Sequence, residues 1–224
     1  MSRGFFLTFE GLDGSGKSTQ LRLLAQALTA IGKTAITTRQ PGDTLLGERI
    51  RTLLLDSKTQ GVAPMTEMAL MFADRAQSIC EIIAPALHAG KIVLCDRFTD
   101  STEAYQGGGR ELGSEPVLAL HRVLCGNLQP DLTILLLPDL DASLTRARRR
   151  NTRQQEASGN ENRFEQENRA FYKRVEAKYH EIAVRDAMRV LTIKGDHPVE
   201  TIQERILQSV LERMQMHGVI PYGS

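Results

Sequence analysis

Short apolar runs alternate along this chain with longer segments in which apolar residues recur every three or four positions. Several of the short runs are apolar almost throughout, which is typical of parallel strands covered on both faces. The strands predicted in this way occupy residues 5–10, 34–38, 91–95, 132–137 and 189–193. The predicted helices occupy residues 18–31, 46–55, 65–89, 115–125, 142–150, 163–185 and 199–214. This alternation predicts an α/β protein with a doubly wound, five-stranded parallel sheet and helices on both faces, formed by one domain over residues 1–224.

Polar side chains end three of the predicted strands abruptly. Asp13 follows the first strand, Arg39 the second, and Asp96 and Arg97 the third. In an open parallel sheet, ligands bind in the crevice beyond the carboxyl ends of the strands. We therefore expect these side chains to converge on one ligand site.

The segment between the first strand and the first helix carries a complete phosphate-binding motif. Residues 11–18 read GLDGSGKS, which matches G-x-x-x-x-G-K-S. The backbone N–H groups of such a loop and the N-terminus of the helix form a cradle for phosphate oxygens. Lys17 can reach the β- and γ-phosphates, and the Ser18 hydroxyl can bind Mg²⁺. The phosphates of a nucleoside triphosphate are expected on Gly11, Leu12, Asp13, Gly14, Ser15, Gly16, Lys17, Ser18 and Thr19.

A phosphoryl acceptor would need cations of its own beside this cradle. Arg39 and Arg97 qualify because each follows a core strand and because guanidinium groups contact phosphate in a bidentate manner. Asp96 occupies the position of a Walker-B-type carboxylate. There it could hold Mg²⁺ directly, hold it through water, or anchor a neighbouring arginine.

One charged segment departs from the periodic pattern. Residues 146–163 contain six arginines, and residues 151–161 show no apolar periodicity and are interpreted as a mobile loop. Such a run can be a solvated face or an arginine-rich lid that closes over phosphates. A lid is the favoured interpretation because a triphosphate site is predicted opposite it. Nucleic acid is a much less favoured partner for this segment than phosphate, since no aromatic residues are interleaved for base stacking.

Composition narrows the class of protein further. The net charge of +1 gives no basic footprint for nucleic acid. Cys80, Cys95 and Cys125 lack metal-ligand or C-x-x-C spacing, which suits buried thiols in a reducing compartment. No apolar stretch reaches the ~18 residues of a membrane span, and the apolar N-terminal run leads directly into the phosphate loop. We expect a soluble, cytoplasmic protein with no membrane or nucleic-acid partner.

Several segments, in this order, resemble those of the thymidylate kinase family. Residues 9–20 (FEGLDGSGKSTQ) resemble its phosphate loop, and residues 38–42 (TRQPG) resemble its T-R-E-P-G segment. Residues 72–75 (FADR) resemble its nucleobase-binding helix, and residues 96–107 resemble its D-R-Y…S-x-x-A-Y-Q-G segment. The likeness extends from about residue 5 to residue 193, which implies a fold of the P-loop NTPase type.

The resemblance also implies the substrates and the roles of individual residues. ATP would be the phosphoryl donor, dTMP the acceptor, Mg²⁺ the metal and a homodimer the assembly. Ser18 and Asp96 would lie at the metal, and Lys17 and Arg97 would be catalytic. The residues implied in acceptor binding are Asp13, Arg39, Phe72, Arg75, Arg97, Ser101, Thr102, Tyr105 and Gln106.

Within this acceptor set, each residue has a distinct implied role. Asp13 would face the sugar 3′-OH, and Tyr105 would lie under the deoxyribose, where a ribose 2′-OH would clash. Phe72 would stack on thymine, and Arg75 would contact a thymine carbonyl. Arg39 and Arg97 would bind the 5′-phosphate, and the base edge would be approached by Ser101 and Thr102, with Gln106 nearby.

Gly14 indicates which kind of family member the chain resembles. Some members carry an arginine here, whereas many bacterial members have Gly or Ala and supply the catalytic arginine from the lid. The resemblance therefore implies a lid-supplied arginine, for which Arg150 and Arg153 are both candidates. The other implied lid residues are Arg146, Arg149, Arg163 and Glu165, the last two in a segment that resembles the D-R-x-E motif.

Four positions depart from the family pattern. They are Gln40, where Glu is usual, Asp43, where Gly is common, and Leu137 and Asn162, where Asp is frequent. Asp43 would weaken acceptor binding by repulsion unless its carboxylate points away or pairs with an arginine.

The implied activity is transfer of the ATP γ-phosphoryl group to dTMP, giving dTDP and ADP. No catalytic base is nominated, because the attacking phosphate oxygen is already anionic. Two alternatives stay open: a kinase for another nucleoside monophosphate or a nucleoside, and a P-loop ATPase switch without an acceptor. A nucleoside would leave Arg39 and Arg97 without a phosphate to bind.

Overall fold

The computed structural model describes residues 4–59, 61–154 and 163–220, without the side chains of residues 150–154 and 165. Its strands form one sheet in the order β2-β3-β1-β4-β5, and every pairing is parallel. They are β1 (Phe5–Gly11), β2 (Ala35–Arg39), β3 (Ile92–Asp96), β4 (Leu132–Leu137) and β5 (Val190–Lys194). The predicted five-stranded parallel sheet is confirmed, and each strand begins and ends within about one residue of its prediction.

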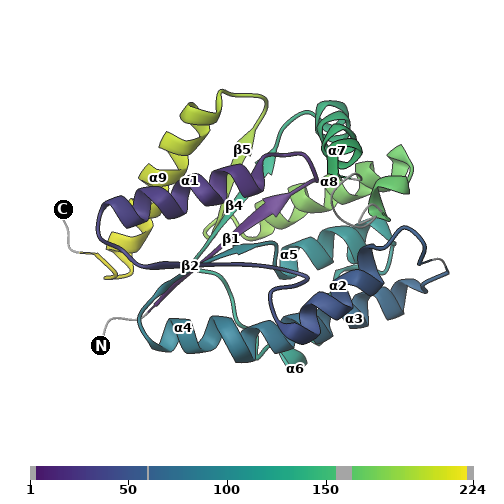
Figure 1. Ribbon diagram of the computed structural model, residues 1–224, viewed down its shortest axis with the longest axis horizontal. Coiled ribbons are helices and arrows are strands. Elements are labelled where there is room, and N and C mark those ends of the chain that lie inside the picture. Colours follow the sequence, from purple (N-terminus) through teal and green to yellow (C-terminus); the bar gives the residue numbers. More distant parts are fainter. Residues whose placement is uncertain (1–3, 60, 155–162, 221–224) are drawn as a thin grey trace.

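Alternate side chains of the central strand enter two different cores. Phe5, Leu7 and Phe9 pack with residues of α1 (Lys17–Ala30) and α9 (Val199–Met216), whereas Phe6 packs on the other face with Ile83 and Phe98. Figure 1 shows α1 and α9 above the sheet and α4 and α6 below it. Both faces of the sheet are therefore covered, which explains why its strands are apolar on both sides.

The helices that cover the lower face include one long run that the sequence predicted as a single helix over 65–89. It consists of α3 (Pro64–Ser78), the π-helical turn η1 (Ile79–Ile83) and α4 (Ala84–His88). Pro85 lacks an N–H group to donate, and the wider π-helical turn ends two residues before it. Two further helices, α2 (Leu45–Leu55) and α6 (Ser114–Leu124), agree with prediction. None of the helices in the described ranges combines the length and apolarity that crossing a membrane requires.

One helical run was not predicted from the sequence. After β3 the chain forms α5 (Thr99–Thr102) and then the π-helical segment η2 (Glu103–Gly109). Its last residues are glycines, which are poor helix formers and gave no apolar periodicity. They allow close packing on α8 (Arg169–Arg185), because a Cβ at Gly109 would lie 2.5 Å from a ring carbon of Phe171.

Two predicted boundaries in the arginine-rich region were wrong. Helix α7 (Leu140–Gln154) continues past residue 150, so that residues 151–154 are helical rather than part of a loop. The predicted helix 163–185 begins instead with a short 3₁₀ turn, η3 (Phe164–Gln166), and α8 starts only at Arg169. Asn168 causes this break because its side chain caps α8 by accepting the N–H of Phe171. The rest of the predicted loop, residues 155–161, lies outside the described part of the chain.

Candidate active site

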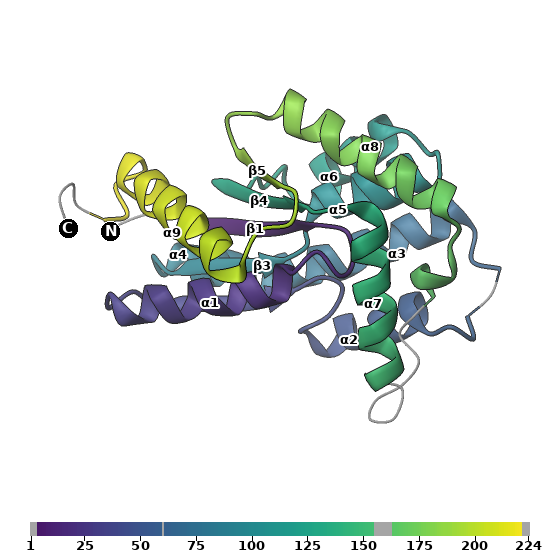
Figure 2. The same cartoon turned by 90° about the horizontal axis from the view of Figure 1, so that it is seen from above.

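The predicted phosphate loop connects β1 to α1, at the carboxyl edge of the sheet. Its residues Gly11, Gly14 and Gly16 have positive φ angles of 132°, 76° and 97°, and the loop passes close to other backbone segments. A Cβ at Gly14 would lie 2.2 Å from the carbonyl oxygen of Ser143 in α7. Figure 2 shows α7 beside this loop at the end of the sheet. The glycine at position 14 is therefore required by both backbone conformation and space.

Lys17 lies inside the loop rather than in solvent. Its ammonium group donates to the carbonyl oxygens of Gly11 (3.1 Å) and Leu12 (2.8 Å), and its side chain is buried. Burial and the charge of Arg97 lower the pKa of Lys17 to about 8, against the opposing effect of nearby carboxylates. A phosphate placed in the loop would restore the charged form by pairing with it.

A hydroxyl and a carboxylate meet at the start of α1. The Ser18 hydroxyl donates to Asp96 Oδ2 at 2.8 Å. The two residues meet because β1 and β3 are neighbours in the sheet, with Phe9 paired to Asp96. Mg²⁺ prefers oxygen ligands and takes only one or two from protein, with waters and substrate phosphates filling the rest. The pair fits such an ion, and in the described ranges no cluster of three or more His, Cys, Asp or Glu offers an alternative.

Arg97 links the end of β3 to the phosphate loop. Its Nη2 lies 2.7 Å from Asp13 Oδ1, and its Nη1 donates to the Gly11 carbonyl oxygen at 2.9 Å. Its φ of 70° is unusual for a residue other than glycine and turns the chain away from the strand direction. Asp13, Asp96 and Arg97 therefore lie together, as their positions after the strands predicted.

Two residues that the sequence did not single out, Glu10 and Tyr179, help to fix Arg97 through Ser101. Glu10 accepts hydrogen bonds from Ser101 Oγ (2.5 Å) and from Tyr179 OH (3.1 Å), and Ser101 Oγ accepts in turn from Arg97 Nη1 at 3.0 Å. Burial, together with the charge of Asp100, raises the pKa of Glu10 to about 7. Glu10 lies in an apolar strand and Tyr179 in α8, so no local pattern indicated that they meet.

Arg39 has a different environment from Arg97. Its Nε lies 3.2 Å from Asp43 Oδ1, and its Nη2 lies 2.8 Å from Glu48 Oε1. Its backbone N–H also donates to Asp43 Oδ2 at 2.8 Å. Arg39 is at the end of β2 in register with Asp96, but its guanidinium is held by these carboxylates. Asp43 thus pairs with an arginine, which is one of the two conditions under which it would not repel an anionic acceptor.

Arg75 and its neighbours form a buried group between α3 and α5. Arg75 Nε donates to Gln40 Oε1 at 2.8 Å, and its Nη2 donates to Thr102 Oγ1 at 3.0 Å. Arg75 Nη1 and Gln40 Nε2 are buried donors without a hydrogen-bond partner in the described structure. The Phe72 ring lies under the Arg75 guanidinium at 4.9 Å and is fully buried. A base that stacks on Phe72 must therefore replace protein atoms that now cover the ring.

Tyr105 and Gln106 project from η2 toward the same region. The Arg97 guanidinium lies over the Tyr105 ring at 5.1 Å, and the Tyr105 ring meets the Phe164 ring edge-on. Gln106 Nε2 donates to Glu67 Oε1 at 2.8 Å. The unpredicted helical run therefore carries Ser101, Thr102, Tyr105 and Gln106 to the predicted site.

The arginine-rich segment is described only in part. Arg146 Nε donates to the Gly14 carbonyl oxygen at 2.8 Å, which fixes the first turns of α7 to the phosphate loop, and Arg149 is exposed. Arg163 lies against Glu67 of α3, with its Nη2 2.6 Å from Oε2. The helix backbone includes Arg150 and Arg153, and η3 includes Glu165, but these three side chains and the whole of Asn162 lie outside the described structure. Leu137 is buried at the end of β4.

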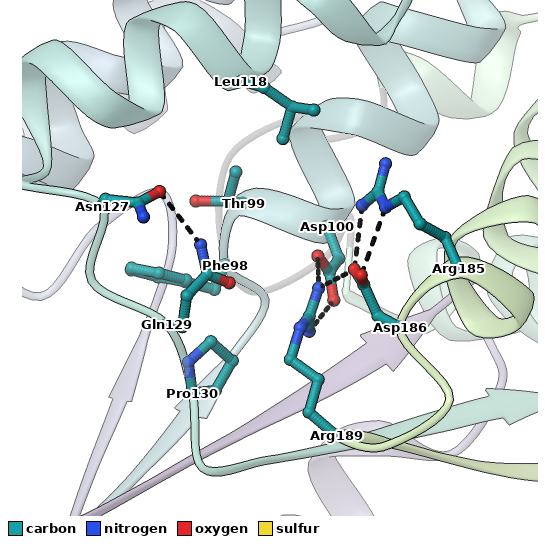
Figure 3. Close-up of a pocket in the computed structure, with 10 residues that line it drawn as sticks. All are labelled: Phe98, Thr99, Asp100, Leu118, Asn127, Gln129, Pro130, Arg185, Asp186 and Arg189. Atoms are coloured by element: carbon teal, nitrogen blue, oxygen red, sulfur yellow. Dashed lines mark hydrogen bonds and ion pairs between the residues drawn. The ribbon is translucent and has the colours of Figure 1, made fainter.

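A separate cavity of about 370 Å³ lies near the amino ends of β4 and β5 (Figure 3). None of the predicted site residues lines it. Its charged side chains point toward one another: Arg189 pairs with Asp100 at 2.7 Å and with Asp186 at 2.6 Å, and Arg185 pairs with Asp186 at 2.9 Å. These paired charges join α5 to the start of β5, which indicates a structural role.

The fold and the loop together define a class of protein. A glycine-rich loop between a parallel strand and a helix, with a buried lysine and a hydroxyl–carboxylate pair, is the site of a P-loop nucleotide-binding protein. The family model for thymidylate kinase matches residues 9–206, nearly the whole chain. The chain belongs to the thymidylate kinase family, and the resemblance seen in its motifs is confirmed.

Individual relatives agree with this assignment. The thymidylate kinase of Pelobacter propionicus is 45% identical over 210 residues, which cover 93% of this chain and 94% of that protein. The thymidylate kinase of Bordetella pertussis is 44% identical over 210 residues, with 94% and 96% covered. The crystal structure of thymidylate kinase from Ehrlichia chaffeensis matches with a TM-score of 0.73 at 31% identity, covering 93% of this chain and 99% of that one.

Proposed function

We propose that this protein transfers the γ-phosphoryl group of ATP to the phosphate of dTMP, giving ADP and dTDP. The observation that carries the proposal is the attachment of Arg97 to the phosphate loop, at Asp13 and at the Gly11 carbonyl oxygen. An acceptor arginine fixed to the donor cradle brings two phosphate groups to one place, and phosphoryl transfer depends on such positioning. Membership of the family supports dTMP as the acceptor.

On the donor side, residues 11–19 hold the ATP phosphates, and Lys17 balances charge at the transferring group. Ser18 and Asp96 hold Mg²⁺ through their adjacent oxygens. When bound, the ion neutralises negative charge on the donor phosphates. Lys17 and the loop N–H groups orient the same phosphates, so that the chain itself supplies most of the alignment.

On the acceptor side, Arg97 is the principal ligand of the 5′-phosphate. Arg39 contributes less, because two carboxylates, Asp43 and Glu48, already bind its guanidinium, whereas Arg97 pairs, within the described ranges, with Asp13 alone. Asp13 faces the sugar 3′-OH, and Tyr105 supports the deoxyribose. The base is held by Phe72, Arg75, Ser101, Thr102 and Gln106, and the unpartnered Nη1 of Arg75 supports a thymine carbonyl as its ligand.

The catalytic arginine is supplied by α7, from Arg150 or Arg153. Arg146 anchors the first part of this helix to Gly14. At 1.5 Å per residue, the backbones of positions 150 and 153 lie roughly 6 Å and 10 Å further along the helix axis. Gly14 itself carries no side chain that could provide the charge.

A coupled assay for ADP release tests the proposed acceptor. Initial rates are measured with ATP, Mg²⁺ and, in turn, dTMP, dUMP, UMP, CMP, AMP, GMP and thymidine. We expect dTMP to give the highest kcat/KM and thymidine to give none, because Arg97 needs a phosphate. Equal use of the monophosphates would contradict the assignment, and ADP release without any acceptor would favour an ATPase switch.

We also propose that the chain is a single-domain, cytoplasmic protein that works as a homodimer. Support for a dimer comes from exposed apolar side chains on α2, α3 and α6. These three helices are neighbours, since α3 packs against both α2 and α6. Leu45 is 79% exposed, Met65 52% and Val123 79%. Sedimentation of the purified protein at micromolar concentration is expected to give twice the mass of the 24.9 kDa chain, and a monomer would contradict this.

A further inference from the structure

Helix α3 carries a buried carboxylate, Glu67, to which no role has been given so far. Glu67 is fully buried, and side chains from two other parts of the chain donate to it. Oε1 accepts from Gln106 Nε2 at 2.8 Å and from Arg110 Nε at 3.1 Å. Oε2 accepts from Arg110 Nη2 at 3.1 Å and from Arg163 Nη2 at 2.6 Å.

The contact with Glu67 determines which way the Gln106 amide faces. A glutamine amide can present either its NH₂ donor or its carbonyl acceptor to a ligand. Arg110 and Arg163 offer only donors, so the carboxylate between them acts as an acceptor and takes the amide nitrogen of Gln106. The Gln106 carbonyl oxygen is then the amide atom directed away from Glu67.

Gln106 and Thr102 both contact α3, the helix that also carries Phe72 and Arg75, two of the other proposed base-binding residues. Two polar contacts join α3 to the α5–η2 run: Arg75 to Thr102, and Glu67 to Gln106. Phe72 lies between Glu67 and Arg75 on α3, and Thr102 and Gln106 are four residues apart on the facing run. In the proposed function, a base seated on Phe72 has both contacts at its edge.

We propose that Glu67 is a positioning residue for nucleobase recognition, which orients Gln106 so that a hydrogen-bond acceptor faces the base. Thymine carries an N3–H donor that a carbonyl oxygen can accept. Cytosine carries an unprotonated N3, which would meet that oxygen lone pair against lone pair and leave both unsatisfied. Glu67 thus selects thymine over cytosine without touching either. This inference rests on the proposed function, in which Gln106 faces the acceptor base.

The substitution Glu67→Gln tests the inference, because an amide can donate to Gln106 as well as accept from it. The values of kcat/KM are measured for dTMP and dCMP, together with the KM for ATP. We expect the dTMP/dCMP ratio of kcat/KM to fall by roughly tenfold or more, because the loss of one hydrogen-bond preference is of that size. The KM for ATP should stay within about twofold of the wild-type value. Glu103→Gln is the matched control, since Glu103 is also buried and pairs with an arginine, Arg185, at 2.6 Å. Its ratio should equal that of the wild type.

A second variant keeps the test decisive if Glu67→Gln does not fold. Gln106→Leu removes the oriented amide, and the dTMP/dCMP ratio should fall as it does in Glu67→Gln. The double variant should show no further fall, because both changes remove one interaction. An unchanged ratio in Gln106→Leu, or equal losses for dTMP and dCMP in Glu67→Gln, would overturn the inference. A wild-type protein that does not prefer dTMP would instead contradict the proposed function.

Discussion

Arg97 takes its position from buried groups at the scale of single residues. Its Nη1 donates to Ser101 Oγ, and both Ser101 and Tyr179 donate to the carboxylate of Glu10. Glu10 also accepts the backbone N–H of Phe98 at 2.7 Å, which fixes the turn after β3. A buried carboxylate with three donors is a rigid support, because any movement would leave a donor unsatisfied.

The titration of Glu10 gives a testable pH dependence of stability. Its pKa is raised to about 7 by burial, from 4.5, so that between these values the folded protein holds a proton that the unfolded chain has released. The resulting stabilisation is complete below pH 4.5 and is lost as the pH rises through 7. From pH 4.5 to 7.5, we expect the free energy of unfolding of the wild type to fall by about 1–3 kcal/mol relative to Glu10→Gln.

Urea unfolding at a series of pH values measures this difference. Glu204→Gln on the exposed side of α9 is the control, and its pH curve should run parallel to that of the wild type. If the curves of Glu10→Gln and the wild type are also parallel, Glu10 does not change its protonation in this range.

The sequence could reveal only part of this residue-level site. Asp13, Asp96 and Arg97 were predicted because a polar residue that ends an apolar strand is visible in the pattern. Glu10 is hidden inside such a strand. Tyr179 reaches it from a helix 169 residues later, and no short-range spacing encodes that contact.

At the scale of elements, the phosphate loop and α7 behave as one packed unit. The carbonyl oxygen of Gly14 accepts from Arg146, and a Cβ at Gly14 would lie 2.2 Å from the Ser143 carbonyl oxygen and 2.9 Å from the Ala147 nitrogen. These are backbone atoms of a helix, so they cannot turn aside as a flexible side chain would. A side chain at position 14 has no room here, which supports the proposal that α7 supplies the catalytic arginine.

Replacement of Gly14 by alanine tests this packing. Gly32→Ala is a matched control, because Gly32 has a φ of 73°, close to the 76° of Gly14, and no atom lies within 4 Å of its Cβ position. Both variants place a Cβ on a left-handed backbone, which is destabilising in each, but only Gly14→Ala must also displace α7. We expect it to cost about 1–3 kcal/mol more in urea unfolding and to raise the KM for ATP. Equal costs would contradict the close approach of α7.

Elements differ in how well the sequence revealed them. The strands and the helices α1, α2 and α9 were predicted because each has an uninterrupted apolar pattern. The run from Thr99 to Gly109 was not, since it ends in three glycines, of which Gly108 and Gly109 let α8 approach. A tertiary contact outweighs helix propensity there, and no local signal reports it.

At the scale of the whole molecule, strand order brings the phosphate loop and Arg97 together. β1 lies between β3 and β4, so the loop after β1 is adjacent to Asp96 at the end of β3 and to Arg97 directly after it. Although these segments are more than 80 residues apart, Arg97 Nη2 lies 2.7 Å from Asp13. The alternating pattern predicted a parallel sheet but not this order, which depends on how the crossover helices pack. The phosphate loop and Arg97 are therefore brought to one place by the topology of the sheet, as the proposed function requires.

The most direct test of this account is the effect of Arg97→Ala on two quantities, kcat with dTMP and the Kd of ATP measured by calorimetry. If Arg97 joins the acceptor phosphate to a donor site that other residues build, kcat should fall by roughly 10³-fold or more, as for other charge-stabilising arginines in phosphoryl transfer. The Kd of ATP should change by less than about threefold, because loop N–H groups and Lys17 hold the donor. A kcat close to that of the wild type would contradict the proposed joining of the two sites through Arg97.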